Sequence, residues 1–158
     1  MGGLFKEVNQ TIFFENREYK YEYNIVSDIP SSQNFIQKVP VKTVFVDFLC
    51  GNEIHTGRPL LERKMNDNPM SNAFKIFQGD KPRESWDSLA MMYAVFGKED
   101  MFSISSNGTI SIDDDGNTVF DDKKSSNHYY VRLKNNKEYY ENKIDNIIKG
   151  GLKDEKDN

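Results

Sequence analysis

Two short stretches of the sequence carry the side chains that could do chemistry. In "KYEYNIVSD", residues 20–28, an extended chain would place Glu22 and Asn24 on one face, although an ordinary half-buried strand shows the same alternation. In "ESWDSLAMMYAV", residues 84–95, Asp87 lies in the first turn of an otherwise apolar helix. A carboxylate at this position either caps the helix, for about 1 kcal/mol, or acts as a ligand for a hard cation or a sugar hydroxyl.

An acidic stretch further along the chain is better interpreted as a hairpin turn than as a calcium loop. If Gly116 takes the glycine position of such a loop, the first ligand is Ser111 and the last is Asp122, where the motif has Asp and Glu. Strand-like residues flank the turn on both sides, which favours the hairpin.

The histidines and the cysteine show no recognisable site. His55 and His128 lie far apart in the sequence, outside the spacing that is typical of a zinc site. Cys50 ends an apolar stretch, which is where α/β folds place active-site groups, but no His or Asn partner can be identified for it. We expect a buried thiol there rather than a nucleophile.

Composition excludes several function classes. The chain has 158 residues, with 21 basic and 25 acidic side chains and a net charge of -4. Without a basic excess, binding to nucleic acid through phosphate neutralisation is not expected. No stretch is apolar for long enough to cross a bilayer, and the single cysteine cannot form an internal disulfide. We therefore expect a soluble, cytoplasmic protein, while export of a longer parent protein stays open.

The first half of the chain predicts a βαβ unit. Residues 27–38 have Ser and Asp at cap positions and Pro30 in the first turn, which indicates a short helix. Residues 41–50 are β-branched and aromatic almost throughout, as in a strand that is buried on both faces of a parallel sheet. Together with an extended 20–28 segment, this order implies a crossover from strand to helix to strand.

The second half predicts three further helices and two hairpins. Helices are expected at 68–77, at 85–97 and at 137–152, where Tyr140, Ile144, Ile147 and Ile148 would form the buried face. Asn107-Gly108 and the Asp-Gly pair at 115–116 each lie between strand-like residues and predict hairpin turns, and residues 128–133 predict another strand. Residues 153–158 are expected to form a disordered charged tail.

Three pieces in one order resemble a known family. They are "MGG" at 1–3, "ENREYKYEYNI" at 15–25 and "SWDSLAMMYAV" at 85–95. Together they resemble the C-terminal half of the nucleoside hydrolases, the calcium-dependent N-ribohydrolases of the inosine-uridine type. The resemblance implies that residues 1–152 form a single, partial α/β domain. Its fold would be the C-terminal part of a parallel-sheet, Rossmann-like fold with a β-hairpin appendage.

The resemblance also implies a role for particular residues. Asn16, Glu22 and Asn24 would hold ribose hydroxyls, because the Asn and the Glu have the family's spacing of six positions. Asp87 would be a calcium ligand that also holds a ribose hydroxyl. Met1 would lie near the ribose. The implied reaction is hydrolysis of the N-glycosidic bond of a ribonucleoside to base and ribose.

Two departures from the family pattern change this expectation. Trp86 replaces a histidine that many members use to protonate the leaving base; Trp86 can stack or pack against the substrate but cannot act as that acid. The family's N-terminal Asp cluster, which supplies most calcium ligands and the base for water, has no counterpart in Met1 to Asn24. We therefore expect an incomplete calcium site and no hydrolase activity from this chain alone. Its expected protein partner is a missing N-terminal half or another copy of the same chain. The alternative is a non-catalytic sugar-binding or interaction domain.

Overall fold

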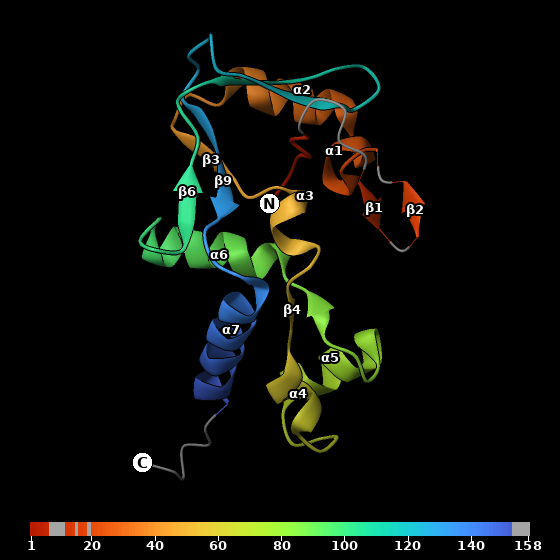
Figure 1. The fold of residues 1–158 in the computed structure, drawn as a ribbon. Helices are drawn as coiled ribbons and strands as arrows, with labels where there is room; N and C mark the ends of the chain where they lie inside the picture. The colour runs from red at the N-terminus through yellow and green to blue at the C-terminus, as the bar shows by residue number, and fades with distance from the viewer. Residues whose placement is uncertain (7–11, 15, 19, 153–158) are drawn as a thin grey trace.

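The computed structural model describes residues 1–6, 12–14, 16–18 and 20–152 and confirms a mixed α/β protein (Figure 1). The helices are α1 (Tyr23–Ser27), α2 (Ile29–Lys38), α3 (Phe48–Gly51), α4 (Arg58–Glu62), α5 (Pro69–Gln78), α6 (Trp86–Phe96) and α7 (Lys137–Gly151). The strands are β1 (Phe13–Phe14), β2 (Arg17–Glu18), β3 (Thr43–Phe45), β4 (His55–Thr56), β5 (Arg83–Glu84), β6 (Phe102–Ile104), β7 (Thr109–Ile112), β8 (Thr118–Asp121) and β9 (His128–Leu133). Within these ranges, no helix has the length and apolar character that crossing a membrane requires.

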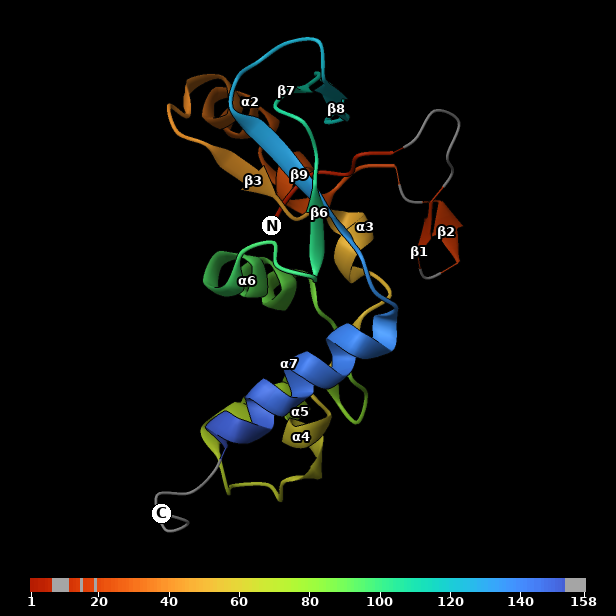
Figure 2. The same cartoon turned by 60° about the vertical axis from the view of Figure 1, so that its left-hand side comes forward.

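The central sheet has three strands in the order β3–β9–β6 (Figures 1 and 2). β3 runs parallel to β9, and β6 runs antiparallel to it. The expected parallel arrangement is therefore present in the β3–β9 pair, while the sheet as a whole is mixed. The remaining described strands form three antiparallel pairs, β1–β2, β4–β5 and β7–β8.

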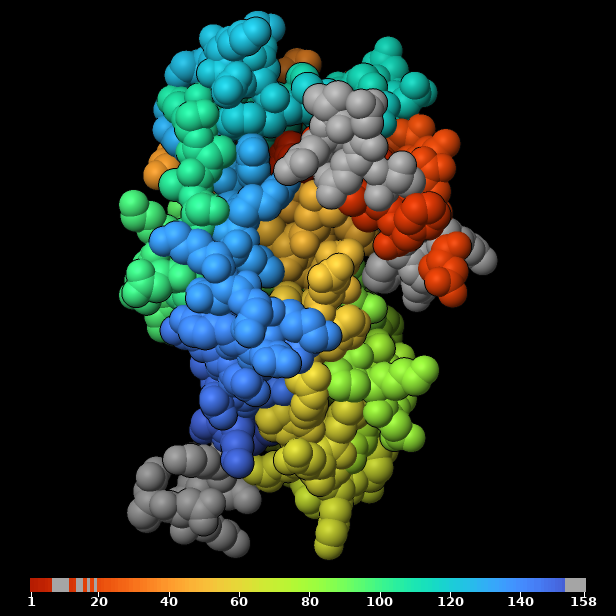
Figure 3. All heavy atoms as spheres, viewed as in Figure 1, coloured from red at the N-terminus to blue at the C-terminus, as the bar shows by residue number. Residues whose placement is uncertain are grey.

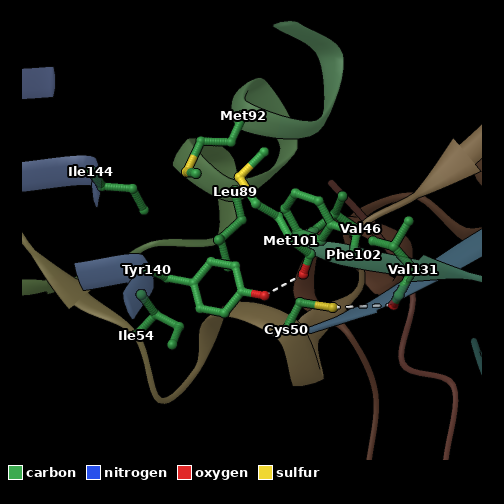
Figure 4. Close-up of a cluster of buried hydrophobic side chains, with 10 residues drawn as sticks. All are labelled: Val46, Cys50, Ile54, Leu89, Met92, Met101, Phe102, Val131, Tyr140 and Ile144. Atoms are coloured by element: carbon green, nitrogen blue, oxygen red, sulfur yellow. Dashed lines mark hydrogen bonds between the residues drawn. The ribbon is translucent and has the colours of Figure 1, made fainter. Parts of the chain in front are cut away.

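The largest of three apolar clusters among the described residues lies between this sheet and the helices α3, α6 and α7 (Figure 4). Its buried members are Val46, Cys50, Ile54, Leu89, Met92, Met101, Phe102, Val131, Tyr140 and Ile144. The hydroxyl of Tyr140 donates to the backbone oxygen of Met101, so the one polar group of this large side chain is satisfied inside the core. The core thereby fixes helix α7 against the chain that enters β6.

An ionic cluster joins helix α4 to helix α7, which lie side by side (Figure 3). The guanidinium of Arg58 lies 3.2 Å from a carboxylate oxygen of Glu141 and 3.1 Å from one of Asp145. The same carboxylates accept hydrogen bonds from the backbone N–H groups of His55 and Gly57. The cluster positions the β4–α4 segment, and through β4 the neighbouring strand β5.

The N-terminal segment, residues 1–6, lies beside the end of β3. The N–H of Gly2 donates to the backbone oxygen of Val46, and the N–H of Phe48 donates to the backbone oxygen of Gly3. Gly3 has a φ of +86°, a conformation that side chains other than glycine rarely adopt. The segment is therefore held by backbone hydrogen bonds to the loop that connects β3 with α3.

Side chains satisfy the next backbone groups of this segment. The N–H of Phe5 donates to Asp47 at 3.0 Å, and the N–H of Leu4 donates to the hydroxyl of Thr118 at 2.8 Å. Arg132 lies 2.9 Å from Asp47 and donates to the backbone oxygen of Phe5. Burial raises the pKa of the Asp47 carboxyl, whereas Arg132 and the Phe5 N–H act in the opposite direction.

The expected strand over residues 20–28 is wrong. Helix α1 begins at Tyr23, because the side chain of Glu22 accepts hydrogen bonds from the N–H groups of Asn24 and Ile25 and so caps a helix. Without this strand, the described residues at the start of the chain form no βαβ crossover. The alternation of apolar and polar residues in this stretch therefore did not distinguish a strand from the start of a helix that Glu22 caps.

The apolar stretch at 41–50 is a strand only in part. β3 ends at Phe45, and its residues are half-buried rather than buried on both faces. The chain then turns at Asp47, whose side chain faces Phe5 and Arg132, and enters helix α3. An apolar run fits a buried helical turn as well as a strand, so the sequence could not locate this boundary.

Of the two predicted hairpins, only the second is confirmed. β7 and β8 pair across a turn in which Asp113 accepts hydrogen bonds from the N–H groups of Asp115 and Asn117. Asn107-Gly108 makes no hairpin, because β6 pairs with β9 and not with β7. Gly108 is packed against Phe120, where a Cβ atom would lie 2.3 Å from the ring.

The longer helices follow the sequence closely. Asp28 caps α2 and Asn68 caps α5, and α6 ends before Gly97. Strand β9 spans the predicted residues, and α7 begins at the predicted position. In α7, Tyr140 and Ile144 are buried, but Ile147 is 50% exposed. The predicted tail at 153–158 falls outside the described residues.

Stability should depend on pH through His128. This side chain is buried, its Nδ1 accepts the Ile110 N–H, and desolvation lowers its pKa. The unfolded chain takes up a proton below about pH 6.5, whereas the folded chain does so only at a lower pH, so the free energy of unfolding falls as the pH drops, by up to about 1.4 kcal/mol per unit. His128→Asn keeps an acceptor for Ile110 and should remove this dependence in urea denaturation between about pH 5 and 7.5. His55→Asn is the control, and an equal slope in His128→Asn and the parent would contradict the assignment.

Candidate functional site

A pocket of about 320 Å³ brings together most of the residues that the sequence singled out. It is lined by Met1, Glu22, Tyr23, Asn24, Phe48, Arg83, Trp86 and Asp87. Met1, Glu22, Asn24, Trp86 and Asp87 were all expected to form one site. Asn16 does not line the pocket; it lies in the turn between β1 and β2, is exposed, and has a φ of +61°.

Glu22 anchors the pocket and keeps capacity for a ligand. Its side chain is only 2% exposed. One carboxylate oxygen accepts the N–H groups of Gly3 and Ile25, at 3.3 and 3.2 Å, and among the described residues the other accepts the N–H of Asn24 alone, at 2.9 Å. A carboxylate offers about four lone-pair sites, so the second oxygen can accept a further hydrogen bond.

Asn24 and Asp87 have polar side-chain groups that the described part of the chain leaves without a partner. Both side chains are exposed, and neither forms a hydrogen bond or ion pair with any residue that the structure describes. The N-cap of α6 is Ser85, so the capping role considered for Asp87 is not seen. Asp87 remains favoured in the first turn of the helix by the helix dipole.

Trp86 forms an aromatic wall with Phe48. The two rings stack with centroids 5.4 Å apart, and the indole N–H of Trp86 donates to the backbone oxygen of Phe48 at 2.9 Å. Gly51 permits this packing, since a Cβ there would lie 2.5 Å from the Trp86 ring. The indole N–H is thus committed to the protein, so Trp86 contributes its ring to the pocket lining and not a proton.

Arg83 is a pocket residue that the sequence did not reveal. It lies on strand β5, half-buried, and donates to the side-chain oxygen of Gln78 at 3.0 Å while its guanidinium lies 4.8 Å from the Phe77 ring centre. No described carboxylate lies within ion-pair distance of it. A single arginine in the polar segment "QGDKPRE" has no periodicity and no motif, so only the fold shows where its charge is placed.

The described residues do not fit a calcium ion. Calcium takes about 6 to 8 oxygen ligands, and structural carboxylates usually supply several of them. In this pocket Asp87 is the one carboxylate without protein partners, and Glu22 already accepts three N–H groups. No cluster of three or more His, Cys, Asp or Glu suited to a metal occurs among the described residues.

The other sequence candidates have structural explanations. Cys50 is buried and donates to the backbone oxygen of Val131, and burial raises the pKa of its thiol to about 12, which disfavours the nucleophilic thiolate. Asp113 accepts hydrogen bonds from within its own turn, which lower the pKa of its carboxyl. The turn is therefore held by local hydrogen bonds, as in a hairpin.

The pocket depends on Glu22 as a cap. Glu22→Ala leaves three buried or half-buried N–H groups without an acceptor, and we expect a loss of about 2–4 kcal/mol in the free energy of unfolding. Urea denaturation measures this loss. Glu53→Ala removes an exposed glutamate and should stay within about 0.5 kcal/mol of the parent. Equal stability of the two variants would show that Glu22 does not hold this region.

Comparison of the chain with protein-family models, with curated proteins and with solved structures gives no match in any of the three.

Proposed function

We propose that this pocket binds the ribose of a ribonucleoside, and that the chain contributes the sugar-binding part of a nucleoside hydrolase-type site. One observation carries the proposal: Glu22 and Asn24 at the start of α1 line the same pocket as Asp87 at the start of α6. The same residues were expected to hold ribose hydroxyls from the resemblance alone.

The chemistry of the lining suits a sugar with a planar base. Asp87 and the second oxygen of Glu22 accept hydrogen bonds, and the amide of Asn24 both donates and accepts. Vicinal hydroxyls of a ribose need this mixture of partners. The stacked Trp86 and Phe48 supply an apolar aromatic surface beside them. Small-molecule sites typically combine such a surface with a few placed polar groups.

Hydrolysis requires groups beyond these. Attack of water on the anomeric carbon needs a base, and the developing oxocarbenium ion needs polar groups around the ribose. Asp87 and Glu22 are already assigned to the sugar, and the residues present do not fit calcium. We therefore propose that these 158 residues bind nucleosides without hydrolysing them, and that carboxylates like those of the family's Asp cluster must complete the site for hydrolysis of the N-glycosidic bond.

A second candidate is a sugar-binding module without catalysis, and the poor fit to calcium favours it. The coding DNA immediately upstream discriminates the two candidates. A segment that encodes an Asp cluster of the family's form supports the hydrolase, and a nucleosidase assay of the joined product tests it directly. The absence of such a segment supports the binding module.

Binding can be followed through the only tryptophan. Because Trp86 is the single Trp of the chain and lines the pocket, its fluorescence should change when inosine or uridine binds. Asp87→Asn should weaken binding about ten-fold or more, since it removes a charged acceptor for a hydroxyl. Asp80→Asn, an exposed carboxylate on the preceding turn, should bind like the parent. If millimolar nucleoside leaves the fluorescence unchanged, or if both variants bind equally, the proposal fails.

Calcium should bind the isolated chain only weakly. Calorimetric titration with calcium chloride should give a Kd no tighter than about 1 mM, because one carboxylate without protein partners cannot replace the ion's water shell. Nucleoside affinity should accordingly be the same with calcium and with a chelator. Tight binding of one calcium per chain, lost in Asp87→Asn, would overturn this expectation.

A further inference from the structure

We infer that a second copy of this chain covers an apolar groove between helices α6 and α7, in a two-fold dimer whose α6 helices run antiparallel. The groove lies next to the proposed nucleoside pocket and shares Asp87 with it. The other residues of the groove do not line that pocket, so the dimer does not depend on nucleoside binding.

The α6–α7 groove has a volume of about 450 Å³ and a lining that is almost wholly apolar. It is lined by Asp87, Ser88, Met91, Met92, Val95, Phe96, Ile144, Ile147 and Ile148. Met91 and Val95 are each 64% exposed, and Ile147 on the facing helix is 50% exposed. The exposed apolar side chains are thus gathered in one place, as at a protein–protein interface.

Helix α6 is apolar on its outer side as well as on its inner side. Its only charged residue is Asp87. Leu89 and Met92 are buried in the core, whereas Met91 and Val95 are exposed to the outside. A helix that is hydrophobic all round is normally buried all round. Figure 2 shows α6 at the edge of the molecule, with no other labelled element beyond it, so its outer side needs cover from another chain.

Two opposite charges lie at opposite ends of this groove. Asp87 is in the first turn of α6. At the other end, the Nζ of Lys143 on α7 lies 5.6 Å from the ring centre of Phe96, the last residue of α6. Neither Asp87 nor Lys143 has an ion-pair partner among the described residues. The groove therefore has a negative end, an apolar middle and a positive end.

This distribution of charge is complementary to a second copy of itself. In a two-fold dimer each contact between two residues occurs twice. If the α6 helices pack antiparallel, Asp87 of each copy lies near Lys143 of the other, and opposite ends of the two helix dipoles adjoin. A partner of one charge sign would meet a like charge at one end of the groove. The charges therefore favour a second copy over an acidic or a basic partner.

The shape of the surface also suits a contact between copies. Met91 and Val95 are four residues apart and form a ridge along α6, beside the groove that Ile147 helps to line. Met91 lies midway between the two ends of α6, which places the two-fold axis near it. The flexible side chain of methionine can adapt to its copy across such an axis. Each copy supplies both a ridge and a groove, so the contact closes at two chains.

Sedimentation equilibrium of the parent chain, from about 1 to 200 µM, should show a monomer–dimer equilibrium. Met91→Glu places like charges next to each other at the two-fold axis and should weaken the dimer about 100-fold or more. Ile76→Glu is the matched control, because Ile76 on α5 is 77% exposed and does not line the groove. This control should dimerise like the parent. Circular dichroism and urea denaturation establish that each variant is folded.

Charge reversal tests the antiparallel arrangement. Asp87→Lys and Lys143→Asp should each weaken the dimer about ten-fold, and the double variant should return to within about three-fold of the parent. A double variant that associates no better than the single ones contradicts the arrangement. Equal association of Met91→Glu and the parent places the interface elsewhere and overturns the inference. A parent that stays monomeric also overturns it, and the groove is then open to a different polypeptide, such as one that the upstream DNA encodes.

Discussion

The pocket depends on how the buried N-terminal segment satisfies its backbone. The segment forms no strand of its own, so the N–H groups of residues 3–5 need side-chain acceptors. Glu22, Thr118 and Asp47 provide them, each from a different part of the chain. An unsatisfied buried N–H costs about 1–3 kcal/mol, so these three contacts together are comparable with a large fraction of the stability of a small domain. They also tie α1, β8 and the β3–α3 loop to one short piece of chain.

The contacts of the N-terminal segment also position residues that line the pocket. Glu22 both accepts from Gly3 and begins α1, so the cap that starts the helix also places Asn24. On the other side, Gly3 accepts from Phe48, whose ring and backbone oxygen hold Trp86. Gly3 is therefore linked by hydrogen bonds to both sides of the pocket, to Glu22 on one side and to Phe48 on the other. Few of these contacts are between neighbours in the sequence, which is why the pocket requires the complete fold.

The charged side chains in the interior of the protein are paired with each other, whereas those that line the pocket are not. Asp47 and Arg132 are paired, and together they hold the backbone of Phe5 on both of its polar groups. Arg83 and Asp87 line one pocket without pairing with each other. A paired buried charge stabilises a particular chain path, whereas an unpaired charge at a pocket is available to a ligand. The contrast separates residues that build this protein from residues that can serve its function.

The sequence by itself determined the elements whose hydrogen bonds are local. Helices such as α2 and α5 were predictable because Asp28 and Asn68 cap them and because periodicity and stop signals act within a few residues. The resemblance also named most of the pocket residues. Only the tertiary structure decided that Glu22 starts a helix, that β6 pairs with β9, and that Arg83 faces the pocket. These outcomes depend on partners far away in the chain, and no local pattern encodes the contact with a distant partner.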